Sequence, residues 1–178
     1  MVLFVTSNHV KFKEAKQILG KIEQTVLEIP EPRGNLIDVS RFKALYAYSL
    51  LHKPLFVDDS GIFIDALNGF PGIYSKYVYN TIGLEGILKL LKYKSNRSCK
   101  MISAITYVDE KNVKTFLGVV EGTISYEIKT GGFAYDNIFI PNGFNLTFSE
   151  NKELKLKISH RTRALIQLRD FLQNNKSF

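Results

Sequence analysis

Cysteine and long apolar runs are scarce in this 178-residue chain, and each scarcity excludes a class of protein. The single cysteine, Cys99, excludes an intrachain disulfide and a cysteine-rich zinc site, which suits a reducing compartment. No long apolar segment follows a basic leader, because residues 1–6 lead straight into polar residues. No Gly-x-Ser-x-Gly occurs, which argues against acyl transfer by an activated serine. We therefore expect a soluble, cytoplasmic protein without a membrane partner.

Apolar residues are sufficient for one substantial core. At 178 residues and 45% hydrophobic composition, the chain is rather short for two independent cores, so we expect a single domain over residues 1–178. Basic residues outnumber acidic ones, 24 against 17, and the formal net charge of +7 attracts polyanions. Because these basic residues are scattered rather than gathered in one arm, a nucleoside triphosphate competes with nucleic acid as the expected partner.

Strand and helix patterns alternate along the first third of the chain. Short apolar runs predict strands over 2–6, 25–29, 55–57 and 138–140. Residues with helical period predict helices over 11–19, 38–51, 82–91 and 161–171, with Asp38 as the cap of the second. Two β-rich runs, 101–107 and 113–124, are typical of an antiparallel hairpin. The pattern predicts an α/β fold in which helices cover a largely parallel sheet.

Two adjacent carboxylates follow the third apolar run. Phe56 and Val57 lead into Asp58-Asp59-Ser60-Gly61, and open α/β sheets bind ligands at the C-terminal ends of their strands. A carboxylate there suits Mg²⁺, which takes hard oxygen ligands and shares substrate phosphates. A solvated turn is an equally open interpretation. Asp38 is a second candidate carboxylate, with a plain helix cap as its alternative.

The segment Thr6-Ser7-Asn8-His9-Val10-Lys11 joins the first predicted strand to the first predicted helix. Backbone N–H groups and the positive end of the helix dipole can converge on an anion at such a junction. The hydroxyls of Thr6 and Ser7 and the ammonium of Lys11 add donors. The segment lacks the glycines of a P-loop, so an ordinary strand-to-helix turn stays open.

Two later segments carry groups that suit a nucleobase. Gly132-Phe133-Ala134-Tyr135-Asp136 places aromatic rings beside a carboxylate, so a ring can stack on a base while Asp136 accepts a hydrogen bond from a ring N–H. Ser159-His160-Arg161 opens the last predicted helix with donors for carbonyl or phosphate oxygens. Aromatic core packing and a simple helix start are the structural alternatives.

Together these segments resemble the inosine triphosphate pyrophosphatase family, also described as XTP/dITP diphosphatases. The matching motifs occur in family order over nearly the whole chain. They are Thr6-x-Asn8-x-x-Lys11, Asp58-Asp59-Ser60-Gly61, residues 66–72 with Tyr74-Ser75, Gly132 to Asp136, and Ser159-His160-Arg161 with Ala164-Leu165.

The resemblance implies Mg²⁺-dependent hydrolysis of non-standard purine nucleoside triphosphates (ITP, dITP and XTP) to the monophosphate and pyrophosphate. It also implies a homodimer without a stable nucleic-acid partner, and an elongated mixed β-sheet flanked by helices, in two lobes with a central substrate cleft. The residues from Thr6 to Lys11 match the triphosphate loop. Asp59 matches the general base and metal ligand, with Asp38 as a second metal ligand and Lys43 as a catalytic-site lysine. The implied substrate contacts are Ser60, Phe133 to Asp136, Lys155, His160 and Arg161.

The chain departs from the family pattern at four positions. Ser7 stands where glycine is common, Asn137 where proline or serine is usual, and Leu156 where asparagine is frequent. Asp38 stands where the family usually has glutamate, so its shorter side chain is expected to reach Mg²⁺ only through water. None of these departures removes a group assigned to the chemical step.

Two rival hypotheses stay open at this point. A Maf-like pyrophosphatase of other nucleotides would share the logic of the fold but lack the combination of Phe133 to Asp136 with Ser159-His160-Arg161. A basic nucleic-acid-binding domain would agree with the net charge and the 12% aromatic content. Pyrophosphate release across a panel of purine and pyrimidine nucleotides separates the three hypotheses, because the Maf-like enzyme differs in substrate and the nucleic-acid-binding domain has no turnover.

Overall fold

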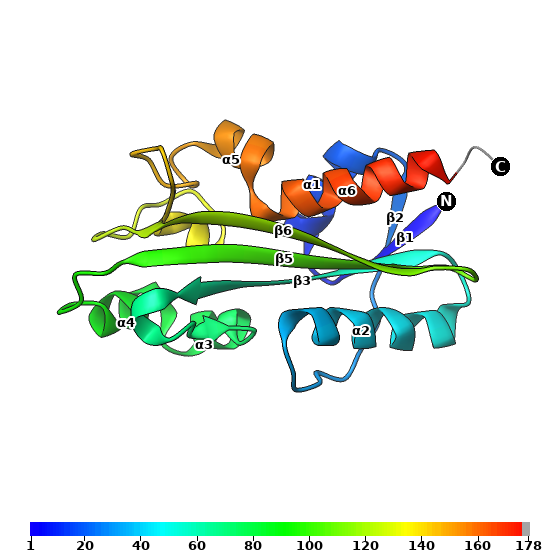
Figure 1. Cartoon of the computed structure of the whole chain (residues 1–178), viewed down its shortest axis with the longest axis horizontal. Helices are drawn as coiled ribbons and strands as arrows, with labels where there is room; N and C mark the ends of the chain where they lie inside the picture. Colours follow the sequence, from blue (N-terminus) through cyan, green and yellow to red (C-terminus); the bar gives the residue numbers. More distant parts are fainter. Residues whose placement is uncertain (176–178) are drawn as a thin grey trace. The chain divides into compact units, whose positions relative to one another are not determined.

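Seven strands form one mixed sheet within residues 1–175, the part of the chain that the computed structural model describes (Figure 1). Their order is β2-β1-β3-β5-β6-β7, with β4 paired to β3. β1 runs parallel to β2 and β3, whereas β4 is antiparallel to β3 and β7 is antiparallel to β6. The strands are β1 (Val2–Val5), β2 (Ile22–Thr25), β3 (Leu55–Ile64), β4 (Pro71–Gly72), β5 (Ser98–Val108), β6 (Val113–Ile124) and β7 (Phe139–Pro141). The expected mixed α/β class is confirmed.

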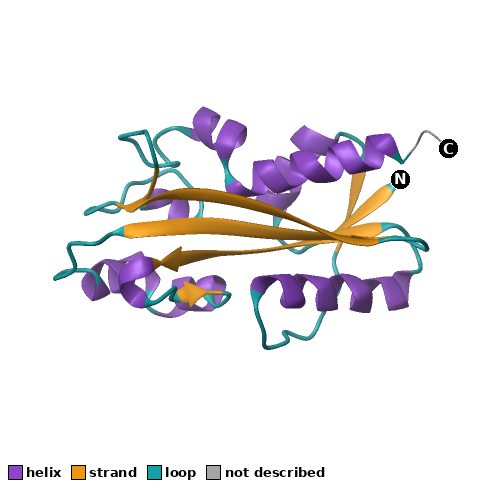
Figure 2. Cartoon of the chain, in the orientation of Figure 1, coloured by secondary structure: helices purple, strands orange, loops and turns teal. Residues whose placement is uncertain are grey.

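Helices and strands alternate along the chain from β1 to β3, and Figure 2 distinguishes the helices in purple from the strands in orange. The α-helices are α1 (His9–Leu19), α2 (Leu36–Leu51), α3 (Ser75–Thr81), α4 (Gly83–Leu90), α5 (Lys152–Ile158) and α6 (His160–Asn174). Two short 3-10 helices, η1 (Asp65–Leu67) and η2 (Ala134–Asn137), complete the order. Among the described helices, none is both long and apolar enough to cross a membrane.

The chain divides into two compact units. The first contains Met1–Asp59, Ser103–Gly118 and the described part of Arg161–Phe178, and the second contains Ser60–Ile102 and Val119–His160. Strands β3, β5 and β6 therefore contribute residues to both units. The substrate cleft between two lobes, implied by the family resemblance, stays a prediction.

In the first unit the alternation of side chains along β1 and β3 separates two apolar layers. Phe4 and Phe56 stack with their ring centroids 4.3 Å apart and pack with apolar residues of α1 and α6. Leu3 and Val5 point to the opposite face, where they pack with Ala44 and other residues of α2. Figure 1 shows α2 on the other side of these strands from α1 and α6. The strands are buried on both faces, which explains their continuous apolar sequences.

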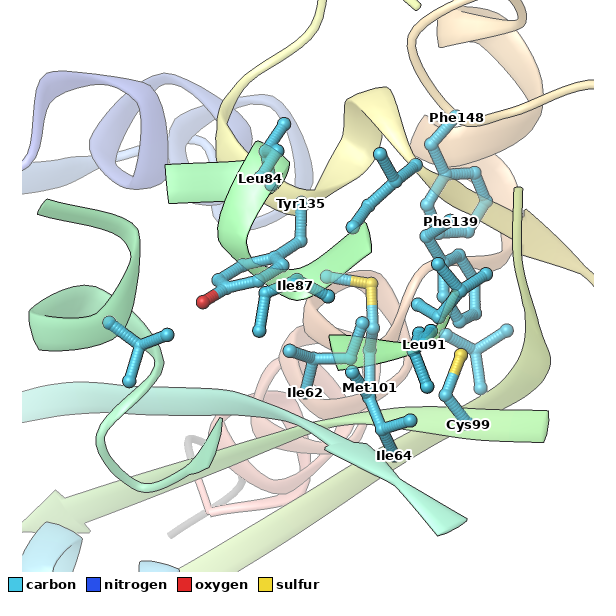
Figure 3. Packing of buried hydrophobic residues seen from close by; sticks show 14 residues of the cluster. Ile62, Ile64, Leu84, Ile87, Leu91, Cys99, Met101, Tyr135, Phe139 and Phe148 are labelled. Atoms are coloured by element: carbon cyan, nitrogen blue, oxygen red, sulfur yellow. The ribbon is translucent and has the colours of Figure 1, made fainter. Parts of the chain in front are cut away.

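The second unit has its own apolar core, part of which Figure 3 shows at close range. Ile62 and Ile64 of β3 pack there with Ile87 of α4 and with Tyr135 of η2. Gly61 precedes them where two backbones approach closely: a Cβ at Gly61 would lie 2.2 Å from the carbonyl oxygen of Gly72. Only glycine fits this contact without a backbone shift, which accounts for the glycine that follows Asp58-Asp59-Ser60.

Several predicted boundaries were wrong. The second strand lies over Ile22–Thr25 rather than 25–29, because the apolar residues Leu27 and Ile29 pack as loop residues against the α2 layer. The strand expected to end at Val57 continues to Ile64 through the two carboxylates. The helix expected over 82–91 is present as α4 (Gly83–Leu90), whereas α3 and α5 were not expected. The hairpin strands β5 and β6 are neighbours in the sheet, as predicted.

Candidate functional site

The loop between β1 and α1 is organised by Asn8. Its side-chain Oδ1 accepts hydrogen bonds from the backbone N–H groups of Val10 (2.9 Å) and Lys11 (3.1 Å), so Asn8 is the N-cap of α1. The hydroxyl of Thr6 accepts a hydrogen bond from the backbone N–H of Asn8 at 3.1 Å. The amides of Val10 and Lys11 are thus already engaged. Because the backbone N–H of Thr6 also donates, to the backbone oxygen of Thr25, donors for an anion in this loop come mainly from side chains.

The strand register places this loop beside Asp58. Phe4 of β1 pairs with Phe56 of β3, so Thr6, just past the end of β1, is level with Asp58 in the parallel register. The ammonium of Lys11 donates a hydrogen bond to the backbone oxygen of Asp58 at 2.7 Å and lies 3.5 Å from its carboxylate. The loop and Asp58 therefore lie side by side, although β3 does not end there.

Asp58 is the buried centre of an ionic network. Its carboxylate accepts a hydrogen bond from the Ser103 hydroxyl at 2.6 Å and one from Nε of Arg161 at 2.6 Å, and its side chain has no exposed surface. Burial alone would raise the pKa of Asp58, but Lys11, Arg161 and the hydrogen bonds outweigh it and hold that pKa below the ordinary value of 3.8. Burial lowers the pKa of Lys11 despite the attraction of Asp58.

Arg161 binds a second carboxylate, Glu14 of α1. Its Nη1 lies 2.5 Å from Oε2 of Glu14, and burial of the guanidinium is more than offset by Asp58 and Glu14, which together raise the pKa of Arg161. Two cations and two carboxylates therefore share one buried cluster. Sequence analysis did not single out Glu14, although its place three residues after Lys11 puts both side chains on one face of the helix.

Asp59 lies in a different environment from its neighbour. Its Oδ1 accepts a hydrogen bond from the ammonium of Lys43 in α2 at 2.7 Å, whereas its Oδ2 is buried without a hydrogen-bond partner among the described residues. Burial raises the pKa of Asp59 above 3.8 even though Lys43 and Lys11 act to lower it. A buried carboxylate oxygen without a donor is costly, which marks it as a position for a ligand.

Lys43 joins Asp59 to Glu31, a residue of the loop before α2. The Lys43 ammonium lies 2.8 Å from Oε2 of Glu31. Burial would lower the pKa of Lys43, but the two carboxylates raise it, so the side chain stays cationic. Glu31 was not predicted as a site residue, because an exposed glutamate between two prolines belongs to no recognisable sequence motif.

Asp38 lies in the first turn of α2 and is exposed. The predicted cap role of Asp38 was wrong: Asn35 is the N-cap, and its Oδ1 accepts hydrogen bonds from the backbone N–H groups of Ile37 and Asp38, both at 3.0 Å. The carboxylate of Asp38 in turn accepts a hydrogen bond from Nδ2 of Asn35 at 2.7 Å. The metal contact expected of Asp38 stays a prediction.

The second unit holds the segment expected to contact the base. Oδ2 of Asp136 lies 2.8 Å from the ammonium of Lys155 and accepts a hydrogen bond from the backbone N–H of Phe133 at 3.3 Å. Tyr135 is buried and donates its hydroxyl hydrogen bond to the backbone oxygen of Ser75 at 2.9 Å, so its ring belongs to the core that Figure 3 shows. Phe133 is 44% exposed and is the ring of this segment that can meet a ligand.

The remaining expected contacts also fall in this unit. Ser60 is half-buried in β3, directly after Asp59. His160 is buried at the first position of α6, after Ser159, whose extended backbone separates α5 from α6. The expected site residues thus form two sets, one in each unit, and the division between the units falls at Asp59–Ser60 and at His160–Arg161.

Comparison with known proteins gives the family. The model of the Ham1 family matches residues 2–171, nearly the whole chain. The chain belongs to the Ham1 family. A curated relative from Methanopyrus kandleri named dITP/XTP pyrophosphatase is 46% identical, covering 98% of this chain and 97% of the relative. A relative of the same name from Saccharolobus solfataricus is 43% identical, covering 96% and 92%.

Solved structures of Ham1 proteins agree with this assignment. The Ham1 protein of Staphylococcus aureus superposes with a TM-score of 0.87 at 27% identity, covering 98% of both chains. A structure described as a nucleoside-triphosphatase and dITP/XTP pyrophosphatase from Mycobacterium abscessus superposes with a TM-score of 0.75 at 28% identity, covering 94% of this chain and 97% of that one.

The carboxylates of this Ham1-family chain fit a hard divalent cation. No group of three or more His, Cys, Asp or Glu side chains suited to a metal ion occurs among residues 1–175. Mg²⁺ does not need such a cage, because it commonly binds one or two carboxylates together with waters and substrate phosphates. The buried, unpartnered Oδ2 of Asp59, with the carboxylate of Glu31 on the same lysine, matches this donor set.

Proposed function

We propose that this chain hydrolyses the purine nucleoside triphosphates dITP, XTP and ITP to the monophosphate and pyrophosphate. The observation that carries the proposal is the buried Asp59 carboxylate, whose Oδ1 is held by Lys43 and whose Oδ2 has no hydrogen-bond partner among the described residues. The names of the two relatives, dITP/XTP pyrophosphatase, support the choice of substrates.

The proposed chemical step uses the two aspartates differently. Asp59 orients a water and accepts its proton while the water oxygen attacks the α-phosphorus. The bond from that phosphorus to the bridging oxygen breaks, and pyrophosphate leaves. The raised pKa of Asp59 makes it a better base than an exposed aspartate. Asp58, with its lowered pKa, stays ionised and holds Lys11 and Arg161.

Asp59 and Glu31 would hold the Mg²⁺ that the family resemblance implies. When bound there, the cation would supply positive charge to the phosphate groups. The protein adds its own charge, because the Lys11 ammonium carries three N–H donors and lies in the loop expected to bind the triphosphate. In the free enzyme the Lys43 ammonium contacts the carboxylates of both Asp59 and Glu31 and offsets the repulsion between them.

Base selection would follow from hydrogen-bond polarity. Hypoxanthine and xanthine present a 6-oxo acceptor beside an N1–H donor, whereas adenine presents the reverse. Donors such as Lys155 or His160 would bind the oxo group, with a backbone carbonyl or Asp136 as the acceptor for N1–H. Phe133 would stack on the ring. Guanine shares the oxo pattern, so its exclusion must act at the 2-amino group.

A substrate panel tests the proposed function. Purified protein is expected to release pyrophosphate from dITP, XTP and ITP much faster than from ATP, GTP or UTP, by a factor on the order of 10² or more if mismatched polar groups stay unpaired. Chelation of divalent ions is expected to stop turnover, and added Mg²⁺ to restore it. Preference for UTP would favour the Maf-like hypothesis. No turnover, with salt-sensitive binding of nucleic acid, would favour the nucleic-acid-binding hypothesis.

The second metal carboxylate is tested by a matched pair of variants. Glu31→Gln is expected to raise the Mg²⁺ concentration for half-maximal rate by roughly tenfold or more, since even an outer partner of a metal ligand is worth about 10- to 100-fold in affinity. Asp38→Asn tests the other predicted metal carboxylate, and Glu28→Gln, at an exposed position of the loop before α2, is the control whose Mg²⁺ dependence is expected to match that of the wild type. The opposite outcome, an effect confined to Asp38→Asn, would return the metal contact to Asp38.

The homodimer and the cytoplasmic location stay predictions from the family resemblance. Analytical sedimentation of the purified protein measures directly whether it is a dimer.

A further inference from the structure

Asn137 holds both ends of the turn that carries the exposed ring of Phe133. Its Oδ1 accepts a hydrogen bond from the backbone N–H of Gly132 at 3.0 Å. Its Nδ2 donates to the backbone oxygens of Ala134 at 3.1 Å and of Gly132 at 3.4 Å. One amide side chain therefore satisfies donor and acceptor groups on both sides of Phe133.

The backbone of this turn is unusual and needs such support. Ala134 has a φ of +48°, a left-handed conformation that residues with a Cβ rarely adopt. A Cβ at Gly132 would lie 2.5 Å from Cβ of Ser149, so the turn is also packed closely against the segment before α5. A non-glycine residue persists in this conformation only where its surroundings fix it, and such residues are frequent in ligand-binding segments.

The conformation that Asn137 fixes determines what the turn presents. Phe133 projects with 44% of its surface exposed, while the neighbouring Tyr135 is buried in the core. The backbone N–H of Phe133 also donates to Asp136, whose carboxylate contacts Lys155. The ring, the carboxylate and the lysine are thus set in one arrangement before any ligand binds.

We propose that Asn137 is a positioning residue that preorganises the base-binding turn 132–136 for the oxo purine. The inference rests on the proposed function, in which this turn contacts the base. Asn137 acts through the backbone of Gly132 and Ala134 and does not itself touch the substrate. A preformed turn lowers the cost of ordering at binding and acts equally on substrate and transition state, so its loss raises KM and leaves kcat nearly unchanged.

The test compares Asn137→Ala with Asn137→Asp and with Asn145→Ala, an exposed asparagine of the same unit. Asn137→Ala is expected to raise KM for dITP by roughly tenfold, the size of one to two lost hydrogen bonds, with kcat within about twofold. Asn137→Asp keeps the acceptor for Gly132 but sets a carboxylate oxygen against the backbone oxygens of Gly132 and Ala134, so its KM should rise at least as much as that of Asn137→Ala. Asn145→Ala should match the wild type.

Two further readouts separate positioning from general damage. The inhibition constant of pyrophosphate, which probes only the phosphate-binding groups, should be unchanged in Asn137→Ala. The amide hydrogen of Gly132 should exchange about tenfold faster in this variant, because its acceptor is gone. An unchanged KM, or an equal rise in the pyrophosphate constant, would overturn the inference.

The proposed function fails separately, by absence of pyrophosphate release from dITP in the wild type. In that event two measurements on wild type and Asn137→Ala test the positioning role of Asn137. They are the rate of amide exchange at Gly132 and the affinity for inosine monophosphate. Faster exchange with weaker binding supports the positioning role. Equal exchange or equal binding overturns it.

Discussion

Asp59→Asn is expected to lower the rate of pyrophosphate release from dITP by roughly 10²- to 10⁴-fold, the usual contribution of a general base. Asparagine keeps the size of the side chain but cannot accept a proton from water. We assign this role to Asp59 because its Oδ2 is buried and has no hydrogen-bond partner among the described residues, while Oδ1 is held by Lys43. Steady-state kinetics measures the loss, and calorimetry should show that dITP still binds.

Asp65→Asn provides the matched control for this variant. Asp65 is an exposed carboxylate at the start of η1, directly after β3. Its replacement is expected to leave turnover at the wild-type value. Near-normal turnover in Asp59→Asn would reject the assignment of Asp59, and loss of dITP binding in that variant would indicate that Asp59 serves binding rather than the chemical step.

Asp58→Asn is expected to lower the free energy of unfolding by about 3–5 kcal/mol at pH 7, the usual cost of removing one partner from a buried ion pair. The amide can still accept a hydrogen bond from Ser103, but an NH₂ group facing Nε of Arg161 would oppose one donor to another. The charges of Arg161 and Lys11 would lose their shared partner. Urea denaturation in the presence of a chelator measures the change without a contribution from metal binding.

The pH dependence of this difference follows from the lowered pKa of Asp58. A carboxylate whose pKa is lower in the folded state contributes stability above its unfolded pKa, near 3.8, and loses it as the pH falls toward the folded pKa. The gap in stability between wild type and Asp58→Asn should therefore be full at pH 7 and shrink below about pH 4. Asp170→Asn, in an exposed pair with Arg169, should change stability by no more than about 0.5 kcal/mol. A gap that is constant with pH would contradict the network.

The contrast between Asp58 and Asp59 could not be predicted from the sequence. Local pattern marked both as candidates at the end of a strand, yet β3 continues through them to Ile64. The strand can continue because Asp58 is compensated by groups from distant segments: Ser103 is 45 residues away and Arg161 is 103 residues away. Such compensation depends on tertiary structure and leaves no local signal in the sequence. Without it, two adjacent carboxylates shortly before a glycine favour a turn.

The junction between the first strand and the first helix was predicted where the structure has it, between β1 and α1. The cap role of Asn8 was not predicted, and the parallel register places this loop beside Asp58. Prediction failed where two similar residues compete: Asn35, not Asp38, caps α2. Glu31 was missed because it enters the site only through its contact with Lys43. Asn137 was noticed only as a departure from the family pattern, since its role depends on the folded turn.

The most direct test of the central claim is the identity of the phosphorus products from dITP. The protein is incubated with dITP and Mg²⁺, and the products are resolved by ³¹P NMR. We expect one pyrophosphate and one nucleoside monophosphate for each dITP consumed, in equal amounts from the earliest time point. Release of orthophosphate with the diphosphate, or no hydrolysis of dITP under any divalent metal, would contradict attack at the α-phosphorus and with it the proposed role of Asp59.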